Sequence, residues 1–138
     1  MTVLDASVLV DALVVGGPNG ELARAALRCA DDLAVPAIFT VEATSALRRL
    51  NLAEEISETV ARAALDALGT LRATVYPFPP FIGRVWSLRR SMTIYDAWYV
   101  SLAESLDTAL VTADNRLARS SGARCPVLDV ATFVAGQG

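Results

Sequence analysis

Histidine and lysine are both missing from the 138 residues of this chain. The absence of histidine excludes Ser-His-Asp and Cys-His catalysis, and it excludes any zinc site with a histidine ligand. The two cysteines, Cys29 and Cys125, stand far apart without the spacing of a metal motif, and we expect both to be buried, reduced thiols. Any chemistry must therefore rest on carboxylates, hydroxyls and arginines, with or without a metal ion.

Long apolar runs are missing as well. Asp5, Asp11 and the pair Gly16-Gly17 interrupt the apolar N-terminal stretch well before the roughly 20 residues that a membrane span needs. No basic start precedes an apolar segment of the secretory type, so we expect a cytoplasmic protein. The length suits one domain, residues 1–138, with a sizeable core. A hydrophobic content of 54% and a mean hydropathy of +0.43 predict apolar surface that a partner covers.

The chain carries 15 acidic and 12 basic residues, and every basic residue is an arginine. The net charge of −3 argues against a nucleic-acid binder, which is usually basic. With four of the 15 acids set aside as metal ligands, however, 11 remain against 12 arginines, so local arginine clusters can still meet phosphates. Solvent-exposed helix faces are the alternative role for these arginines. The candidates are Arg48, Arg49, Arg84, Arg89, Arg90, Arg116 and Arg119.

The hydrophobic pattern predicts strands that alternate with helices. Short apolar runs indicate five strands, at 2–4, 33–35, 74–76, 109–112 and 127–128. Helical spacing indicates helices at 7–15, 21–30, 36–50, 52–71, 81–90, 93–105, 115–120 and 129–135, with a glycine-rich turn at 16–20 and Pro36 in a helical first turn. In the helix 52–71, Val60, Ala64, Leu65 and Leu68 are expected to face inward. This order is typical of an α/β fold with a mainly parallel sheet covered on both faces.

The stretch TVLDASVLV, residues 2–10, sets an acid between an expected strand and an expected helix. The strand ends at Asp5, and the helix begins just behind it at Ser7. A carboxylate in this position lies at the carboxyl edge of the sheet, where ligands of open α/β sheets bind. We therefore expect the rest of the chain to bring further acids to Asp5.

Three further acids stand where a carboxylate is costly to bury. Glu42 lies among apolar residues early in a helix, Asp96 lies in the first turn of a nearly all-apolar helix, and Asp114 follows the fourth strand. Buried carboxylates need hydrogen bonds, partners or a cation. Oxygen ligands without histidine or cysteine suit Mg²⁺ or Mn²⁺. Such ions activate water and neutralise phosphate charge during in-line displacement.

Local explanations stay open for two of these acids. Thr93 with Asp96 three residues later has the form of a capping box, so Asp96 can serve in a helix cap. Asp114 can cap the short helix that follows it. Asp5 is harder to explain by its own helix, and Glu42 alone is uninformative.

Several polar and aromatic residues have two open roles each. Ser7 and Thr112 are candidates to hydrogen-bond the acids or a metal-bound water, with helix capping and strand packing as the alternative. Trp86, Trp98 and Tyr95 are expected in the core or an interface rather than as base-stacking platforms.

Four parts of the sequence stand out together: VLDASVLVDAL, Glu42 after Pro36, IYDAWYVSLAESL and LVTADNRLAR. In their order and spacing they resemble the PIN-domain ribonucleases, and most of all the VapC-type toxins of bacterial toxin–antitoxin pairs. The resemblance covers essentially the whole chain. It implies a PIN-like α/β/α sandwich around a five-stranded, mainly parallel sheet, and an acidic cluster that binds Mg²⁺ or Mn²⁺. In that cluster Asp5 and Asp96 are the direct metal ligands, and Glu42 and Asp114 are further candidates.

The same resemblance implies endonucleolytic cleavage of RNA and inhibition by a cognate VapB antitoxin. The arginines expected to contact RNA are Arg48, Arg49, Arg89, Arg90 and Arg116. The apolar excess of the chain predicts a homodimer that also binds an antitoxin helix in an apolar groove.

Two other functions remain as alternatives. In a catalytically silent PIN-like module that binds RNA or protein, the acids would serve no chemistry, and the presence of all four argues against it. In a metal-dependent phosphotransfer domain, Asp5 would be the nucleophile. That role is disfavoured because no second acid stands two residues after Asp5, as in phosphatases of the haloacid-dehalogenase type, and because lysine is missing.

Overall fold

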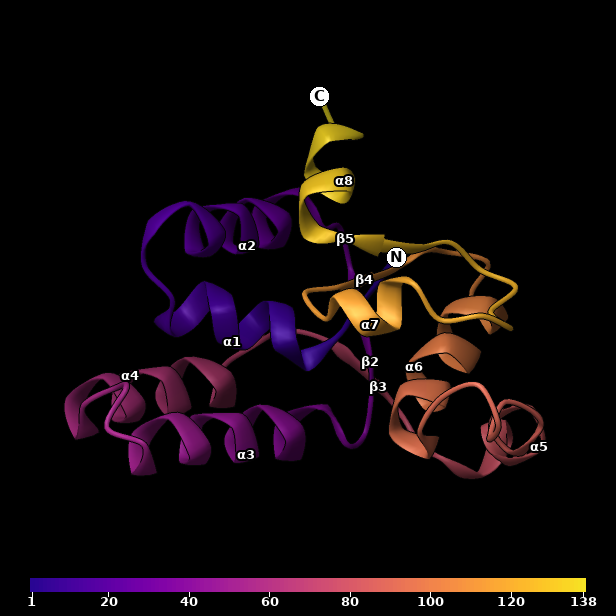
Figure 1. Ribbon diagram of the computed structural model, residues 1–138, viewed down its shortest axis with the longest axis horizontal. Helices are drawn as coiled ribbons and strands as arrows, with labels where there is room; N and C mark the ends of the chain where they lie inside the picture. The colour runs from indigo at the N-terminus through magenta and orange to yellow at the C-terminus, as the bar shows by residue number, and fades with distance from the viewer.

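A computed structural model describes residues 1–138, and Figure 1 shows its strands and helices. The elements follow one another along the chain as β1 (Thr2–Leu4), α1 (Ala6–Val14), α2 (Gly17–Cys29), β2 (Leu33–Pro36), α3 (Phe39–Leu52), α4 (Glu58–Gly69), β3 (Thr74–Tyr76), a 3₁₀ turn (Pro79–Phe81), α5 (Ile82–Ser87), α6 (Ile94–Ser105), β4 (Leu110–Thr112), α7 (Asn115–Ala118), β5 (Val127–Asp129) and α8 (Val130–Ala135). Strands alternate with helices, so the predicted α/β class is confirmed.

The five strands form one parallel sheet in the order β3-β2-β1-β4-β5, which confirms the predicted five-stranded sheet. Thr2 of β1 pairs with Leu33 of β2, and Val3 of β1 pairs with Leu110 of β4. The chain builds the sheet outward from β1 in one direction and then in the other, so the strand order reverses between β1 and β4. Ligands of open α/β sheets bind outside the carboxyl ends of the strands at such a reversal.

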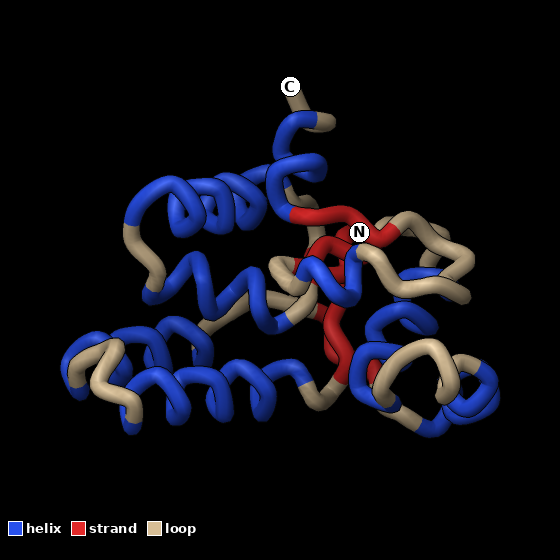
Figure 2. Tube along the Cα trace, viewed as in Figure 1, coloured by secondary structure: helices blue, strands red, loops and turns tan.

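Helices cover both faces of this sheet. Figures 1 and 2 show the strands in the middle, with α1 to α4 on one side and α5 and α6 on the other. Successive residues of β1 point to opposite faces. Val3 packs in a buried cluster that includes Tyr99 and Leu102 of α6, whereas Leu4 packs in a second cluster with Phe133 of α8. The central strand is therefore buried on both sides.

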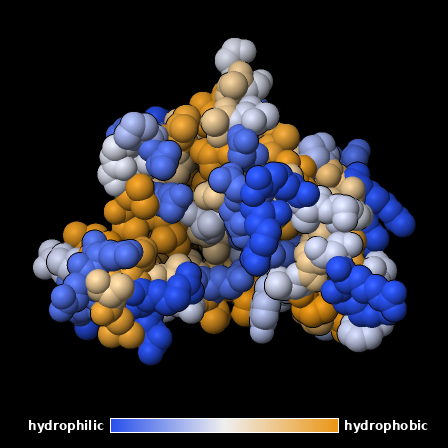
Figure 3. All heavy atoms as spheres, viewed as in Figure 1, coloured by the Kyte–Doolittle hydropathy of each residue, from blue (hydrophilic) through white to orange (hydrophobic).

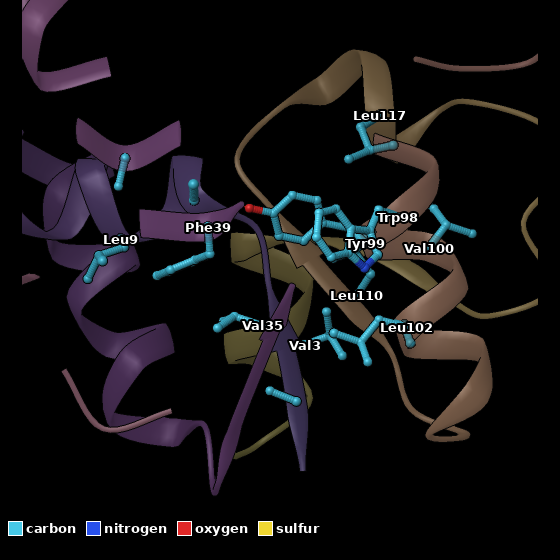
Figure 4. Packing of buried hydrophobic residues seen from close by; sticks show 14 of the residues in the cluster. Val3, Leu9, Val35, Phe39, Trp98, Tyr99, Val100, Leu102, Leu110 and Leu117 are labelled. Carbon is cyan, nitrogen blue, oxygen red and sulfur yellow. The ribbon is translucent and has the colours of Figure 1, made fainter. Parts of the chain in front are cut away.

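The helix α6 is buried along most of its length. Its seven consecutive residues from 97 to 103 are all buried, as the apolar pattern predicted. The hydroxyl oxygen of Thr93 accepts a 3.1 Å hydrogen bond from the N–H of Asp96, which confirms the predicted N-cap. Figure 4 shows side chains of α6 packed around Val3 and Leu110 of the sheet. The first turn of α6, which carries Asp96, is thus fixed to the core.

The segment 16–20 is not a turn, contrary to the prediction. The helix α2 begins at Gly17 with Pro18 in its first turn. It can start this close to α1 because Gly20 has no side chain: a Cβ atom there would lie 1.8 Å from the carbonyl oxygen of Val15. The contact is between the ends of two different helices. The hydrophobic spacing of the local sequence therefore does not predict it.

Three predicted helices have different boundaries in the structure. Pro36 ends β2 instead of opening a helix, and α3 begins at Phe39. The predicted helix 52–71 starts later, because residue 52 belongs to α3, residues 53–57 are not helical, and the hydroxyl of Ser57 caps α4 at its start. Val60 and Leu65 were predicted to face inward, but they are 41% and 36% exposed. The buried residues of α4 are Ala61, Ala64 and Leu68. The predicted helix 81–90 is shorter, because the 3₁₀ turn precedes α5 and α5 ends at residue 87.

Two further expectations concern cysteines and membranes. Cys29 and Cys125 are both free thiols, as expected, but each is only partly buried. None of the helices combines the length and the apolar character that crossing a bilayer requires.

Candidate active site

Asp5 lies at the carboxyl end of the central strand β1, where it is only 9% exposed. It occupies the N-cap position of α1, but its side chain makes no capping hydrogen bond. The hydroxyl of Ser7 donates to Oδ2 of Asp5 at 2.7 Å, and the hydroxyl of Thr112 donates to the same oxygen at 2.8 Å. The other oxygen, Oδ1, accepts no hydrogen bond from any other side chain. Side chains therefore hold this carboxylate through Oδ2 alone, and the backbone N–H of Ala6 also favours its charged form.

The same two hydroxyls join the ends of β1 and β4. The N–H of Ala113 donates to the hydroxyl oxygen of Ser7 at 3.1 Å, and the N–H of Asp114 donates to that of Thr112 at 3.0 Å. The expected hydrogen bonds of Ser7 and Thr112 are thus present. They hold Asp5 and Asp114 at one edge of the sheet, on the two strands where the strand order reverses.

Glu42 lies in the first turn of α3, where the hydroxyl of Tyr99 donates a 2.7 Å hydrogen bond to its Oε1. Tyr99 is fully buried in α6, and Figure 4 shows its hydroxyl directed away from that helix toward the segment that carries Phe39. Burial and the charge of Glu42 raise the pKa of Tyr99, so the phenol stays protonated and donates. The sequence analysis missed Tyr99. The available signal was a phenol hydroxyl in a stretch too apolar to leave it unpaired.

Asp96 and Asp114 differ in their local surroundings. Oδ1 of Asp114 accepts hydrogen bonds from the N–H groups of Arg116 and Leu117 at 2.9 and 3.4 Å, so Asp114 does cap α7. Oδ2 of Asp114 lies 3.5 Å from a guanidinium nitrogen of Arg116. Asp96 takes part in the cap of α6 through its backbone N–H. Capping thus occupies Oδ1 of Asp114, and Oδ2 lies within ion-pair distance of Arg116.

The four acids form one electrostatically coupled cluster. Burial raises the pKa values of Asp5, Glu42 and Asp96. The charge of Asp114 adds to the increase in the pKa of Asp5 and of Asp96, and the charge of Asp5 adds to the increase at Glu42 and Asp96. Arg116 opposes the rise in the pKa of Asp96. Repulsion within the cluster therefore disfavours the charged form of three of its members.

The donor chemistry of this cluster fits a hard cation. Every side-chain donor is an oxygen, which suits Mg²⁺ and Mn²⁺. A divalent cation would also relieve the repulsion that raises these pKa values. In this conformation, no three aspartate, glutamate or cysteine side chains are arranged to hold a metal ion. A bound ion would therefore have to draw the carboxylates together.

The candidate arginines are in different situations. Arg84 is committed to Glu104, with Nε 2.7 Å from Oε1, and is not free to contact a phosphate. The guanidinium of Arg89 lies 4.6 Å from the ring centre of Trp86. Arg116 lies beside the acids. The side chains of Arg48, Arg49, Arg90 and Arg119 are on exposed positions.

The three aromatic residues singled out in the sequence divide between core and surface. Trp98 is 8% exposed and belongs to the core, as expected. Trp86 and Tyr95 are 61% and 57% exposed, so a core role is wrong for both, and the expected interface role stays a prediction.

The fold and this edge of the sheet define a class of protein: an α/β domain with acids at the strand-order reversal of a parallel sheet. The PIN-domain family model matches residues 2–122. Ribonuclease VapC1 of Mycobacterium tuberculosis is 44% identical over 126 residues, which cover 91% of this chain and 94% of that protein. VapC ribonuclease Mb0985 of Mycobacterium bovis is 39% identical over 127 residues, 92% of this chain and 96% of that protein. The chain belongs to the PIN-domain family, within its VapC branch.

Solved structures share the fold at lower sequence identity. PAE2754 from Pyrobaculum aerophilum superposes with a TM-score of 0.72 at 23% identity, over 99% of this chain and 88% of that one. A chain of FitAB bound to an IR36 DNA fragment superposes with a TM-score of 0.62 at 16% identity, over 94% of this chain and 95% of that one. These similarities support the PIN-like architecture, which confirms the fold that the sequence predicted.

Proposed function

We propose that this chain is a Mg²⁺-dependent endoribonuclease and the toxin of a VapBC-type toxin–antitoxin pair, with residues 1–138 forming a single PIN-like domain. The observation that carries the proposal is the geometry of Asp5, which is held through one oxygen at the strand-order reversal, beside three further acids. The relatives named as VapC ribonucleases align with more than nine-tenths of the chain, and their name supports RNA as the substrate.

The proposed roles follow from the positions of the acids. Asp5 and Asp96 are the metal ligands, and Ser7 and Thr112 orient Asp5 through its Oδ2. A bound divalent cation supplies charge neutralisation and water activation. Glu42 and Asp114 complete the site, either as ligands of a second ion or as the groups that orient and deprotonate the attacking water.

The reaction is an in-line displacement at phosphorus. The water oxygen forms a bond to phosphorus and its proton passes to a carboxylate, while the bond to the 3′ oxygen breaks and that oxygen takes up a proton from solvent. The products carry a 5′-phosphate and a 3′-hydroxyl. Tyr99 positions Glu42 in this scheme through its hydrogen bond.

RNA must approach an acidic site, so cations elsewhere have to offset the repulsion. We assign this role to exposed arginines, which contact backbone phosphates without reading sequence. The candidates are Arg48, Arg49, Arg89, Arg90 and Arg116.

The helices α3 and α4 are the proposed surface for the antitoxin and for a second copy of the chain. Large hydrophobic residues are exposed there: Val41, Leu52, Val60 and Leu65. A cavity of 290 Å³ lies between the two helices, lined by Leu47, Asn51, Ala61 and Leu65 among others. Figure 3 shows hydrophobic atoms gathered on the same side of the molecule, over α1 between α2 and α4. A VapB antitoxin helix and a homodimer contact are the partners proposed for this apolar area.

One observation keeps a second candidate function. No three acids are arranged around a metal position. This arrangement is equally compatible with a PIN-like module that binds RNA or protein without cutting RNA. Metal-dependent cleavage separates the two.

The decisive experiment incubates total cellular RNA with the purified chain and Mg²⁺ or Mn²⁺, against EDTA. Asp5→Ala and Asp96→Ala are the test variants, and Glu58→Ala, an exposed acid on α4, is the matched control. We expect cuts at discrete positions that need the metal and both aspartates but not Glu58. Undiminished cleavage by Asp5→Ala would overturn the site. A folded chain that binds RNA but never cuts it would establish the non-cutting module instead.

A further inference from the structure

A small polar cavity opens beside Asp96, between the connection from α5 to α6 and the helix α7. Its volume is 130 Å³, and its polar lining consists of Ser91, Thr93, Asp96, Arg116 and Ser120. Asp96 is the one member of the acidic cluster among its lining residues. The cavity therefore adjoins the proposed active site without being part of its carboxylate cluster.

The lining of this cavity carries hydrogen-bond donors that the chain itself does not use. The hydroxyl oxygen of Thr93 accepts from the N–H of Asp96, which leaves its own O–H free to donate. The hydroxyl of Ser91 has no side-chain hydrogen bond. The side chain of Arg116 is 78% exposed, and its one ion-pair contact, to Asp114, is 3.5 Å long. An exposed pair of this length contributes little to stability, so a structural role does not account for Arg116.

The size of the cavity limits what can fill it. At roughly 30 Å³ for each water molecule, 130 Å³ holds about four waters. That space is large enough for a phosphate group. Figure 3 shows hydrophilic residues gathered over α7, at the centre of the visible face. An anionic group can thus reach the cavity across a polar surface.

We propose that this cavity, which we call the Arg116 pocket, binds the RNA backbone phosphate next to the one that is cleaved. The guanidinium group of Arg116 donates bidentate hydrogen bonds to the two non-bridging oxygens of this phosphate, and the hydroxyls of Ser91 and Thr93 donate to the same oxygens. The pocket shares Asp96 with the acidic cluster, so a phosphate bound there sets the neighbouring phosphodiester over the acids. The proposal rests on the proposed function and adds a positioning site to it.

Binding measurements separate the pocket from the chemistry. The probe is a fluorescently labelled single-stranded RNA of random sequence, and the full-length chain carries Asp5→Asn to prevent cleavage. In this background Arg116→Gln should weaken binding about tenfold and reduce the slope of log K against log salt concentration by about 0.7, the loss expected for one phosphate contact on a single strand. Arg116→Lys should restore the slope but not the full affinity, because lysine keeps the charge without the fork. Ser91→Ala should weaken binding about threefold and leave the slope unchanged.

The matched control is Arg72→Gln. Arg72 is exposed just before β3, at the amino-terminal edge of the sheet and away from the acids, so its loss should change neither affinity nor slope. With Asp5 intact, Arg116→Gln should raise the KM for RNA cleavage and leave kcat within about twofold, because a positioning contact to a neighbouring phosphate contributes to binding.

Three other outcomes have distinct meanings. If the unmodified chain cleaves RNA while Arg116→Gln and Arg72→Gln bind alike, the Arg116 pocket is overturned and the proposed function stands. A loss of kcat at unchanged KM also overturns the pocket, since Arg116 would then act on the acids. A chain that neither binds nor cleaves RNA overturns the proposed function and the pocket with it.

Discussion

The hydroxyl of Tyr99 and the carboxylate of Glu42 are joined by a 2.7 Å hydrogen bond across 57 residues of sequence. Tyr99 belongs to the buried face of α6, whereas Glu42 stands in the first turn of α3. The bond therefore anchors one acid of the candidate site to the helix that carries another, Asp96.

Removing this hydroxyl tests its importance. Tyr99→Phe keeps the ring in the core but leaves Glu42 without its donor, so RNA cleavage should fall about tenfold and the free energy of unfolding by about 1–2 kcal/mol. Initial cleavage rates and urea unfolding measure the two effects. Tyr95→Phe is the control, because Tyr95 is 57% exposed and its hydroxyl has no hydrogen bond. Equal activity of the two variants would show that the Tyr99 hydroxyl is dispensable.

The raised pKa of Asp5 predicts how stability changes with pH. Burial, aided by the charge of Asp114, raises the pKa of Asp5 above its ordinary value of 3.8, so the folded chain holds this proton more tightly than the unfolded chain. The stability that Asp5 contributes is full below about pH 3.8 and is lost as the pH rises through its folded pKa. In EDTA, Asp5→Asn should therefore gain stability over the unmodified chain as the pH rises from about 4 to 7. Urea unfolding at several pH values measures the difference, and a constant difference would contradict the assignment.

The ion pair between Arg84 and Glu104 should stabilise the packing of α5 on α6. Burial alone would raise the pKa of Glu104, but hydrogen bonds from Arg84 and from the N–H of Arg124 lower it overall. Glu104→Gln should cost about 1–2 kcal/mol of unfolding free energy at neutral pH. Because the folded pKa is lowered, this contribution is full above about pH 4.5 and is lost as the pH falls through the folded pKa.

The matched control for this pair is Glu58→Gln. Glu58 pairs with Arg62 on the surface of α4, where both side chains are more than two-thirds exposed, so its loss should cost at most about 0.5 kcal/mol. Equal losses in the two variants, measured by urea unfolding, would show that the buried pair has no special role.

The corner between α1 and α2 depends on Gly20. Gly20→Ala places a Cβ atom 1.8 Å from the carbonyl oxygen of Val15, so the two helices must separate, and we expect a loss of at least about 2 kcal/mol. Gly83→Ala is the control in α5, where no atom lies within 4 Å of the new Cβ, and it should stabilise the chain by about 0.5–1 kcal/mol. Thermal unfolding of both variants gives the comparison. Equal midpoints would mean that the corner adapts without cost.

The parts of the fold that the sequence predicted are those with a local cause. The strand at 74–76 and the cap at Thr93 follow from patterns a few residues long, and the structure has both. The start of α2 at Gly17 was missed because it depends on the contact between Gly20 and Val15. A break between α3 and α4 was predicted at residue 51, but it lies at residues 53–57, where Ser57 caps the start of α4.

The candidate site divides in the same way. Asp5 and Asp114 were placed at the sheet edge because each lies within two residues of a strand end, and Ser7 and Thr112 were tied to the acids by proximity in sequence. Tyr99 was missed because its partner is brought to it by packing of α3 near α6.

The hydrogen bond from Thr112 to Asp5 connects positions 107 residues apart. During synthesis at roughly 5–20 residues per second, Thr112 is made about 5–20 s after Asp5. Until then, the growing chain on the ribosome contains the part of the carboxylate site that precedes Thr112, and β1 lacks its neighbour β4. A nascent chain that ends before Thr112 therefore carries Asp5, Glu42 and Asp96 but lacks Asp114 and the hydrogen bond that orients Asp5.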